Sequence, residues 1–249
     1  MKDFEVPDNG EERTDFSETI PEQFIVTEKE LDQELYDQFI AESEWVDPQP
    51  DYANLIRQGE QLTDKTMPIA QKKLSLVQLA CRGTAEAYRL VQEYCTRPDS
   101  GLEEWSKIAL YECRMRMESD LLDEPVGLIS TGLGGDGQRL RFIFVLALLG
   151  EGAEKERQQV MRKVLDEVCE RYGSGIEQAE FQPSCIVVQV LVPLDVAVGE
   201  VIEESVALLN RGKEEVCQDY LVTNVAEPTE EDIQKFLGEL AGKQGGERS

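Results

Sequence analysis

The chain has 249 residues, a formal net charge of −26 and no histidine. This length can bury a sizeable core in one large domain or two small ones. The missing histidine excludes Ser-His-Asp and Cys-His catalysis and the HExxH zinc site, so we expect no catalytic residues. The acidic charge repels phosphate groups. We therefore expect no direct nucleic-acid binding, and a basic or mixed protein surface as the partner.

The six cysteines are at least fourteen positions apart, which leaves no CxxC pair and no zinc-finger or iron–sulfur spacing. We expect free thiols in a reducing compartment, with no metal and no cofactor. No apolar run approaches the eighteen or so residues of a membrane span. The stretch Met1–Asp15 is acidic and lacks the features of a signal peptide. These patterns predict a cytoplasmic protein without membrane contact.

Residues 1–50 form an acidic segment with 16 Asp or Glu and 3 Lys or Arg. Pro7, Gly10 and Pro21 interrupt residues 1–26, which show no sustained period, so we expect them to be mobile. From residue 27 to 45 the pattern becomes helical, and Thr27 with Glu30 has the spacing of a capping box. The stripe of this helix docks either on the chain's own body or on a partner. We take as partner-binding candidates Leu31, Leu35, Phe39 and Trp45.

Residues 51–122 read as helices joined by short loops. A proline at 68 and a glycine at 83 bound one helix, and Thr84 begins the next. The stretches RGTAEAYRLVQEY (82–94) and PDSGLEEWSKIALYECR (98–114) resemble a HEAT-like repeat within residues 52–122. That resemblance implies a protein-docking scaffold. An ordinary helical bundle is the alternative.

After Pro125 the period changes to two, and residues 126–226 read as strand, helix, strand, strand, helix, strand. This order is the split βαβ pattern of ferredoxin-like folds. A further strand at 126–131 is expected to form a hairpin with residues 139–149. The prediction is an α+β fold: an all-helical N-terminal domain, HEAT-like or a bundle, plus a ferredoxin-like sandwich with an added hairpin strand.

Residues 227–249 predict a C-terminal helix and tail, with Thr229 and Asp232 at the start of the helix. Its apolar stripe includes Phe236 and Leu237, which we add to the partner-binding candidates. Both faces of the predicted sheet are apolar, so something must cover the second one. The helical domain, the acidic N-terminal helix and a second copy of the chain, as a homodimer, are the three alternatives.

The glycine-rich loop at 127–137 admits two interpretations. It lacks the Walker lysine and leads into a strand rather than a helix, so a hairpin at Gly135-Asp136-Gly137 is favoured over a phosphate loop. The leading hypothesis for the whole chain is a non-enzymatic interaction or adaptor protein. The alternative is a small-molecule or nucleotide-binding regulatory domain. Its candidate ligand residues are Ser130, Thr131, Gly134, Gly135, Arg139 and Arg141.

Overall fold

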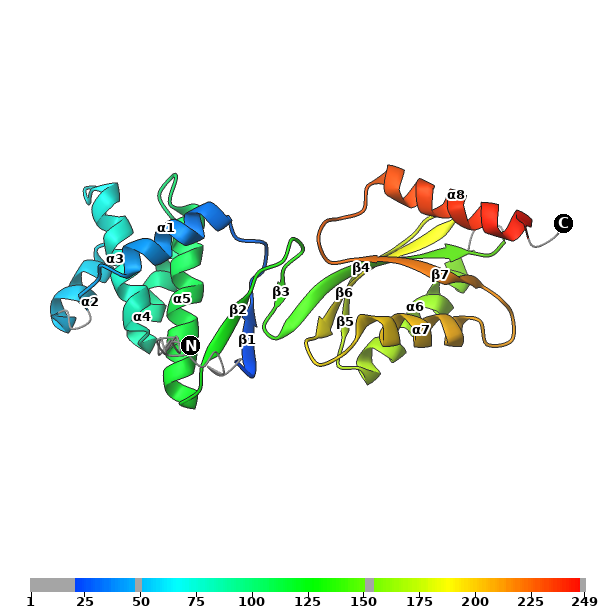
Figure 1. The fold of residues 1–249 in the computed structure, drawn as a ribbon, viewed down its shortest axis with the longest axis horizontal. Helices are drawn as coiled ribbons and strands as arrows, with labels where there is room; N and C mark the ends of the chain where they lie inside the picture. The colour runs from blue at the N-terminus through cyan, green and yellow to red at the C-terminus, as the bar shows by residue number, and fades with distance from the viewer. Residues whose placement is uncertain (1–20, 48–50, 151–154, 247–249) are drawn as a thin grey trace, which may run out of the picture.

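The computed structural model describes residues 21–47, 51–150 and 155–246. It shows two lobes along the long axis of the molecule, with a narrow waist between them (Figure 1). One lobe is helical and the other is built on an antiparallel sheet. The α+β class predicted from the sequence is therefore confirmed.

In its described residues the helical lobe has five helices. Asp51 and Thr84 cap the starts of two helices by accepting backbone N–H bonds, as short polar side chains do at this position. Gly83 ends the helix before Thr84 with φ +60°, and a Cβ there would lie less than 3.0 Å from the Arg116 side chain. The five helices are α1 (Gln33–Ser43), α2 (Tyr52–Glu60), α3 (Ile69–Arg82), α4 (Ala85–Cys95) and α5 (Glu103–Leu122).

The core of this lobe is centred on Trp105 of α5. Phe39 of α1 is 1% exposed, and its ring centroid lies 5.1 Å from that of Trp105. Leu31 and Leu35 pack half-buried against the same core. The apolar stripe of the acidic helix therefore packs on the chain's own helical lobe.

The start of α1 differs from the prediction. Asp32, and not Thr27, is the N-cap, because the Asp32 carboxylate accepts the Leu35 N–H at 3.0 Å. Thr27 instead extends a strand, β1 (Gln23–Val26), by donating its N–H to the Ile129 carbonyl. The prediction of mobility for residues 1–26 is therefore wrong at β1, and its first twenty residues lie outside the described ranges.

The sheet of the second lobe is organised around β4 (Arg139–Leu148). One edge of β4 pairs with β6 (Cys185–Pro193), which also pairs with β5 (Gly175–Phe181). The opposite edge pairs with β7 (Val216–Thr223) and, at its start, with the two-residue β3 (Gly135–Asp136). All of these pairs are antiparallel.

The strand β2 (Val126–Ile129) does not form the predicted hairpin with β4. Both edges of β4 are occupied, one by β6 and the other by β7 and β3. The strand pairs in parallel with β1 instead, in the register Gln23 to Val126 and Val26 to Ile129. The added hairpin strand of the sheet is β3, next to the turn at Gly137.

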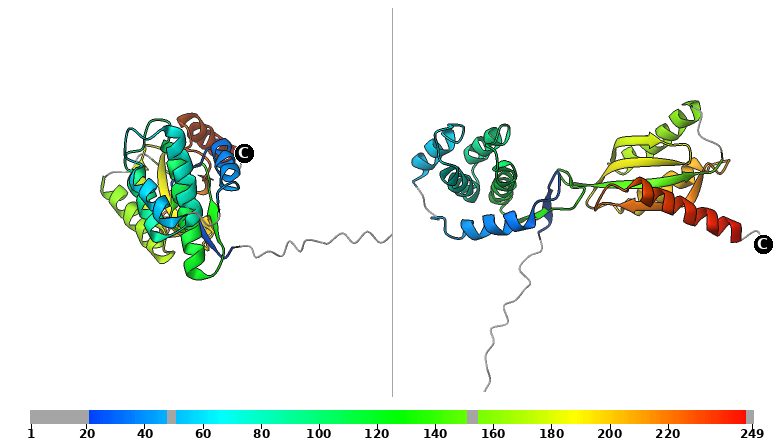
Figure 2. Two further views of the ribbon diagram at one scale, coloured as in Figure 1. Left: turned by 90° about the vertical axis from the view of Figure 1, so that its left-hand side faces the viewer. Right: turned by 90° about the horizontal axis from the view of Figure 1, so that it is seen from above.

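Two helices cover one face of the sheet, α6 (Lys155–Arg171) and α7 (Val198–Leu209). The C-terminal helix α8 (Glu230–Gly246) lies on the opposite face (Figures 1 and 2). It packs there through Ile233, Phe236 and Leu237, against Val145 and neighbouring side chains of β6 and β7. The cover of the second sheet face is therefore α8, which was not among the three alternatives predicted.

At the start of α8, the side chains of Thr229 and Asp232 each accept a hydrogen bond from the other residue's backbone N–H. The Asp232 N–H donates to the Thr229 hydroxyl at 3.2 Å, and the Thr229 N–H donates to the Asp232 carboxylate at 2.9 Å.

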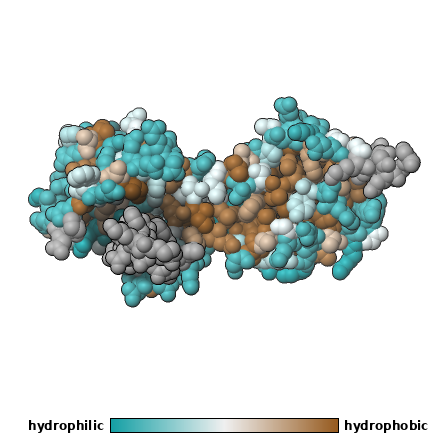
Figure 3. All heavy atoms as spheres, viewed as in Figure 1, coloured by the Kyte–Doolittle hydropathy of each residue, from teal (hydrophilic) through white to brown (hydrophobic). Residues whose placement is uncertain are grey.

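Apolar residues still reach the surface at the waist and across the second lobe (Figure 3). Among the described helices, none is long and apolar enough to cross a membrane.

Candidate functional site

The glycine-rich loop joins the two lobes. The end of β1 runs between β2 and the β3 hairpin, and it hydrogen-bonds on both sides. Thr27 N–H donates to Ile129 O on one side at 2.9 Å, and Gly135 N–H donates to Thr27 O on the other at 2.7 Å. Val26 N–H also donates to Gly137 O at 3.0 Å. We call this junction, formed by residues 25–28 and 129–137, the joint.

Three glycines let backbone segments approach closely at the joint. A Cβ on Gly132, Gly134 or Gly135 would lie less than 3.0 Å from backbone atoms of another segment. For Gly134 those atoms belong to Glu28 and the following residue, and its φ is +63°. The glycines are therefore explained by chain packing and by a left-handed backbone conformation, without any bound phosphate.

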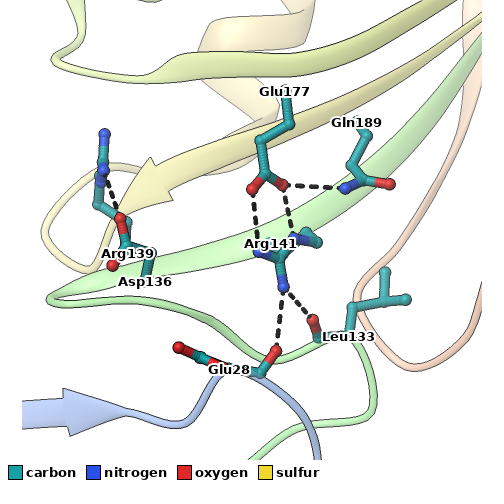
Figure 4. A network of polar contacts seen from close by, with 7 residues as sticks. All are labelled: Glu28, Leu133, Asp136, Arg139, Arg141, Glu177 and Gln189. Carbon is teal, nitrogen blue, oxygen red and sulfur yellow. Dashed lines mark hydrogen bonds and ion pairs between the residues drawn. The ribbon is translucent and has the colours of Figure 1, made fainter. Parts of the chain in front are cut away.

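Arg141 connects the joint to the sheet (Figure 4). Its guanidinium makes a bidentate ion pair with Glu177 of β5, with Nε and Nη2 at 2.5 and 2.9 Å from the two carboxylate oxygens. Its Nη1 donates to two main-chain carbonyls, Leu133 O at 2.7 Å and Glu28 O at 3.1 Å. Gln189 Nε2 also donates to Glu177, at 3.0 Å. One side chain thus holds three segments that are distant in sequence.

The electrostatics favour the charged form of both partners. Hydrogen bonds from Arg141 lower the pKa of Glu177 below its ordinary value, against the opposing effect of burial. Hydrogen bonds to Glu177 raise the pKa of Arg141 in turn. The Arg141 and Glu177 side chains are 20% and 30% exposed, so the pair is screened less than a surface ion pair.

The six ligand candidates predicted from the loop all lie at or beside the joint. Ser130 Oγ accepts the Leu31 N–H at 2.8 Å and the Thr27 hydroxyl at 3.2 Å. Gly134 N–H donates within the loop, and Arg139 pairs with Asp136 at 2.9 Å. The Thr131 hydroxyl is buried without a hydrogen-bond partner. Most of the polar groups that could meet an anion are therefore engaged by the protein itself.

A groove of about 980 Å³ opens beside the joint. Its walls are the β1–α1 connection, the facing sides of α4 and α5, and the turn at Asp136 and Gly137. The groove carries three cations, five carboxylates and two tyrosines. These are Lys29, Lys107, Arg114, Glu28, Glu30, Asp32, Glu104, Asp136, Tyr88 and Tyr111.

Tyr111 and Lys107 are among the groove side chains that are held by defined contacts. The Tyr111 hydroxyl accepts the Glu28 N–H at 2.8 Å, and burial raises the pKa of this tyrosine. Lys107 pairs with Glu104 at 2.6 Å, and the hydrogen bond to that carboxylate raises the pKa of the lysine. Sequence reasoning missed the groove, because its residues come from four separate stretches and match no local motif.

The other predicted site residues are dispersed. Leu31, Leu35 and Phe39 belong to the helical lobe, whereas Trp45 is 87% exposed near the end of α1. Phe236 and Leu237 lie on the second sheet face, in the other lobe. The structure thus does not bring the six partner-binding candidates into one surface.

The described ranges contain no group of three or more His, Cys, Asp or Glu that could hold a metal ion. All six cysteines are free thiols. Burial raises the pKa of Cys113 to about 12 and that of Cys169 to about 11, so these two thiols are poor nucleophiles at neutral pH.

Comparisons with known proteins identify no family. No family model matches the chain, and no curated protein matches it. Among solved structures, a putative transposase from Deinococcus radiodurans R1 is similar at a TM-score of 0.36 and 14% identity. The match covers 41% of this chain and 90% of that one. A likeness at this level assigns no activity to the chain.

Two sequence-based predictions are nevertheless corrected. The non-enzymatic adaptor and the exclusion of direct nucleic-acid contact differ from the description of this neighbour as a transposase, and neither prediction is retained. The exclusion rested on the total charge, which does not describe each surface. Residues 1–50 carry about half of that charge, whereas residues 126–226 hold 16 acidic and 9 basic residues. The homodimer through the second sheet face is likewise not retained, since α8 lies on that face.

Proposed function

We propose that the chain is a ligand-binding protein whose groove between the lobes takes a small polar molecule bearing both positive and negative charge. The observation that supports this is the mixed lining of the groove, with lysines and carboxylates around two tyrosines. Of the glycine-rich loop, the site includes only the turn at Asp136 and Gly137. The polar groups of the rest of the loop are largely used within the joint.

The position and size of the groove favour this proposal. Ligand sites occur preferentially where two parts of a protein meet, and their volumes are about 300–1,000 Å³. A volume of about 980 Å³ is at the upper end of that range. Lys107 and Glu104 form an ion pair on one turn of α5, and their side chains are 50% and 43% exposed. Because an exposed pair contributes little stability, the carboxylate and the amine of one ligand can exchange with these two opposite charges.

Calorimetry and thermal unfolding with four probe sets test the proposal. The sets are amino acids with dipeptides, nucleotides, polyamines, and a short single-stranded DNA. We expect the zwitterionic set to bind. A ligand at a hundredfold its dissociation constant stabilises by about 2.7 kcal/mol, which raises the melting temperature by roughly 5–11 °C.

Lys107→Gln removes a groove cation and should weaken this binding. Lys163→Gln, at an exposed position of α6, is the matched control and should leave it unchanged. If no probe binds, or if both variants bind as the parent does, the proposal is wrong. DNA binding that is weakened only by Lys107→Gln would place a nucleic acid in the groove instead.

A further inference from the structure

The groove wall between β1 and α1 is held by contacts to several parts of the molecule. The backbone of Glu28 is bound at both of its polar groups. Its N–H donates to Tyr111 of the helical lobe, and its carbonyl accepts from Arg141 of the sheet. Three residues on, the Leu31 N–H donates to Ser130 of the loop between β2 and β3. The position of this wall therefore depends on contacts from both lobes.

Among these contacts, the one from Arg141 joins the residues that are farthest apart in the sequence. The Glu177 carboxylate fixes the guanidinium plane through two parallel hydrogen bonds, a geometry that only arginine provides. The remaining nitrogen, Nη1, is then directed at the carbonyls of Glu28 and Leu133 (Figure 4). Glu177 thus orients Arg141, and Arg141 orients the wall.

We infer that Arg141 is a positioning residue: oriented by Glu177, it acts as a latch that holds residues 26–31 against the sheet and so sets the shape of the groove. Ligand binding in the groove and closure of this latch are then coupled, because both require the same wall. This coupling rests on the proposed function. The latch itself does not, because its contacts exist without a ligand.

Arg139 supplies a matched control on the same strand. It stands two residues before Arg141 and also pairs with a carboxylate, Asp136, at 2.9 Å. That pair lies within the hairpin, three residues apart, and no hydrogen bond from Arg139 to Glu28 or Leu133 is seen among the described residues. Removing either arginine removes one cation and one ion pair, but of the two only Arg141 has a hydrogen bond to the wall at residues 26–31.

Amide hydrogen exchange on the full-length chain without ligand tests the latch. In Arg141→Gln, the amides of residues 26–31 should exchange roughly tenfold faster, the change in opening equilibrium expected for the loss of one charge-assisted hydrogen bond. Arg139→Gln should leave them at the parental rate. Amides of α5 and β6 report whether each variant is folded. Parental exchange of 26–31 in folded Arg141→Gln would overturn the inference.

A reversed ion pair separates positioning from plain stabilisation. The double variant Arg141→Glu with Glu177→Arg restores opposite charges, but a carboxylate at 141 cannot donate to the Glu28 carbonyl. We expect its melting temperature to recover relative to Arg141→Glu alone, while residues 26–31 keep exchanging fast. If the reversed pair also restores slow exchange, the arginine acts as a generic ion-pair partner and the latch is wrong.

Affinity measurements then test the coupling. For a probe that binds the parent, Arg141→Gln should weaken binding more than Arg139→Gln does. Equal affinity in both variants would overturn the coupling even where exchange supports the latch. If no probe binds the parent, the proposed function fails, and the exchange result still decides the latch.

Discussion

Replacing Gly134 by alanine should break the joint in a way that can be measured against an internal control. Gly134 and Gly137 both have φ +63°, so the left-handed backbone conformation raises the free energy of an alanine by the same amount at either position. Their surroundings differ. A Cβ on Gly134 would lie less than 3.0 Å from the Glu28 carbonyl, whereas a Cβ on Gly137 would meet nothing within 4 Å.

The expected magnitudes follow from this geometry. The left-handed conformation costs an L-residue about 1–2 kcal/mol, which should be the whole effect of Gly137→Ala. In Gly134→Ala the Glu28 segment must also move away from the hairpin. The bonds from Gly135 N–H to Thr27 O and from Arg141 to Glu28 O are then lost. Such bonds contribute about 0.5–1.5 kcal/mol when neutral and about 1.5–3 kcal/mol when charged, so Gly134→Ala should exceed the control by at least ~2 kcal/mol.

Urea unfolding followed by circular dichroism gives the two free energies of unfolding, and calorimetry gives the melting temperatures. An extra ~2 kcal/mol corresponds to a further drop of about 4–8 °C for a chain of this size. If the two variants are destabilised equally, within about 0.5 kcal/mol, the close approach at Gly134 contributes nothing and the account of the joint is wrong.

Three further predictions concern other parts of the molecule. Phe39→Ala empties a fully buried position in the helical lobe and should cost about 3–5 kcal/mol in urea unfolding. Because Arg141 lowers the pKa of Glu177, the stabilisation by this pair should be complete above the carboxyl's ordinary pKa of 4.5 and lost as the pH falls through the lowered folded-state value. The difference in urea midpoint between the parent and Glu177→Gln should therefore shrink toward acid pH, and a constant difference would contradict it. Ile233→Asp should free α8 and increase binding of an apolar dye, whereas Gly238→Asp, at an exposed position of the same helix, should not.

Local signals predicted the regular elements of both lobes. Prolines, glycines and capping residues bound α3 and α4 where the sequence places them, at Gly83 and Thr84. The order β4, α6, β5, β6, α7, β7 follows the alternation of periods read from residues 126–226. These features depend on neighbours within a few positions, so they can be read from a single sequence.

The features that the sequence did not predict depend on contacts between residues that are far apart in the chain. Thr27 and Glu30 do have the spacing of a capping box, but the Thr27 backbone pairs with β2 more than a hundred residues away, and Asp32 caps α1 instead. The partner of the second sheet face, α8, is likewise the last element of the chain. The candidate groove collects residues from the β1–α1 connection, two helices and a turn, so no stretch of sequence contains its pattern.

The glycine-rich loop shows why one composition can suit two sites. An anion loop and a close backbone joint both need glycines, small hydroxyl residues and arginine, because in each case these groups surround oxygen atoms. Here the oxygens belong to the chain: the Glu28 and Leu133 carbonyls and the Glu177 carboxylate. An anion entering at Arg141 would have to displace a carboxylate already bound through two hydrogen bonds. Anion binding at Arg141 therefore requires this ion pair to break, whereas a phosphate loop offers the anion a preformed cradle.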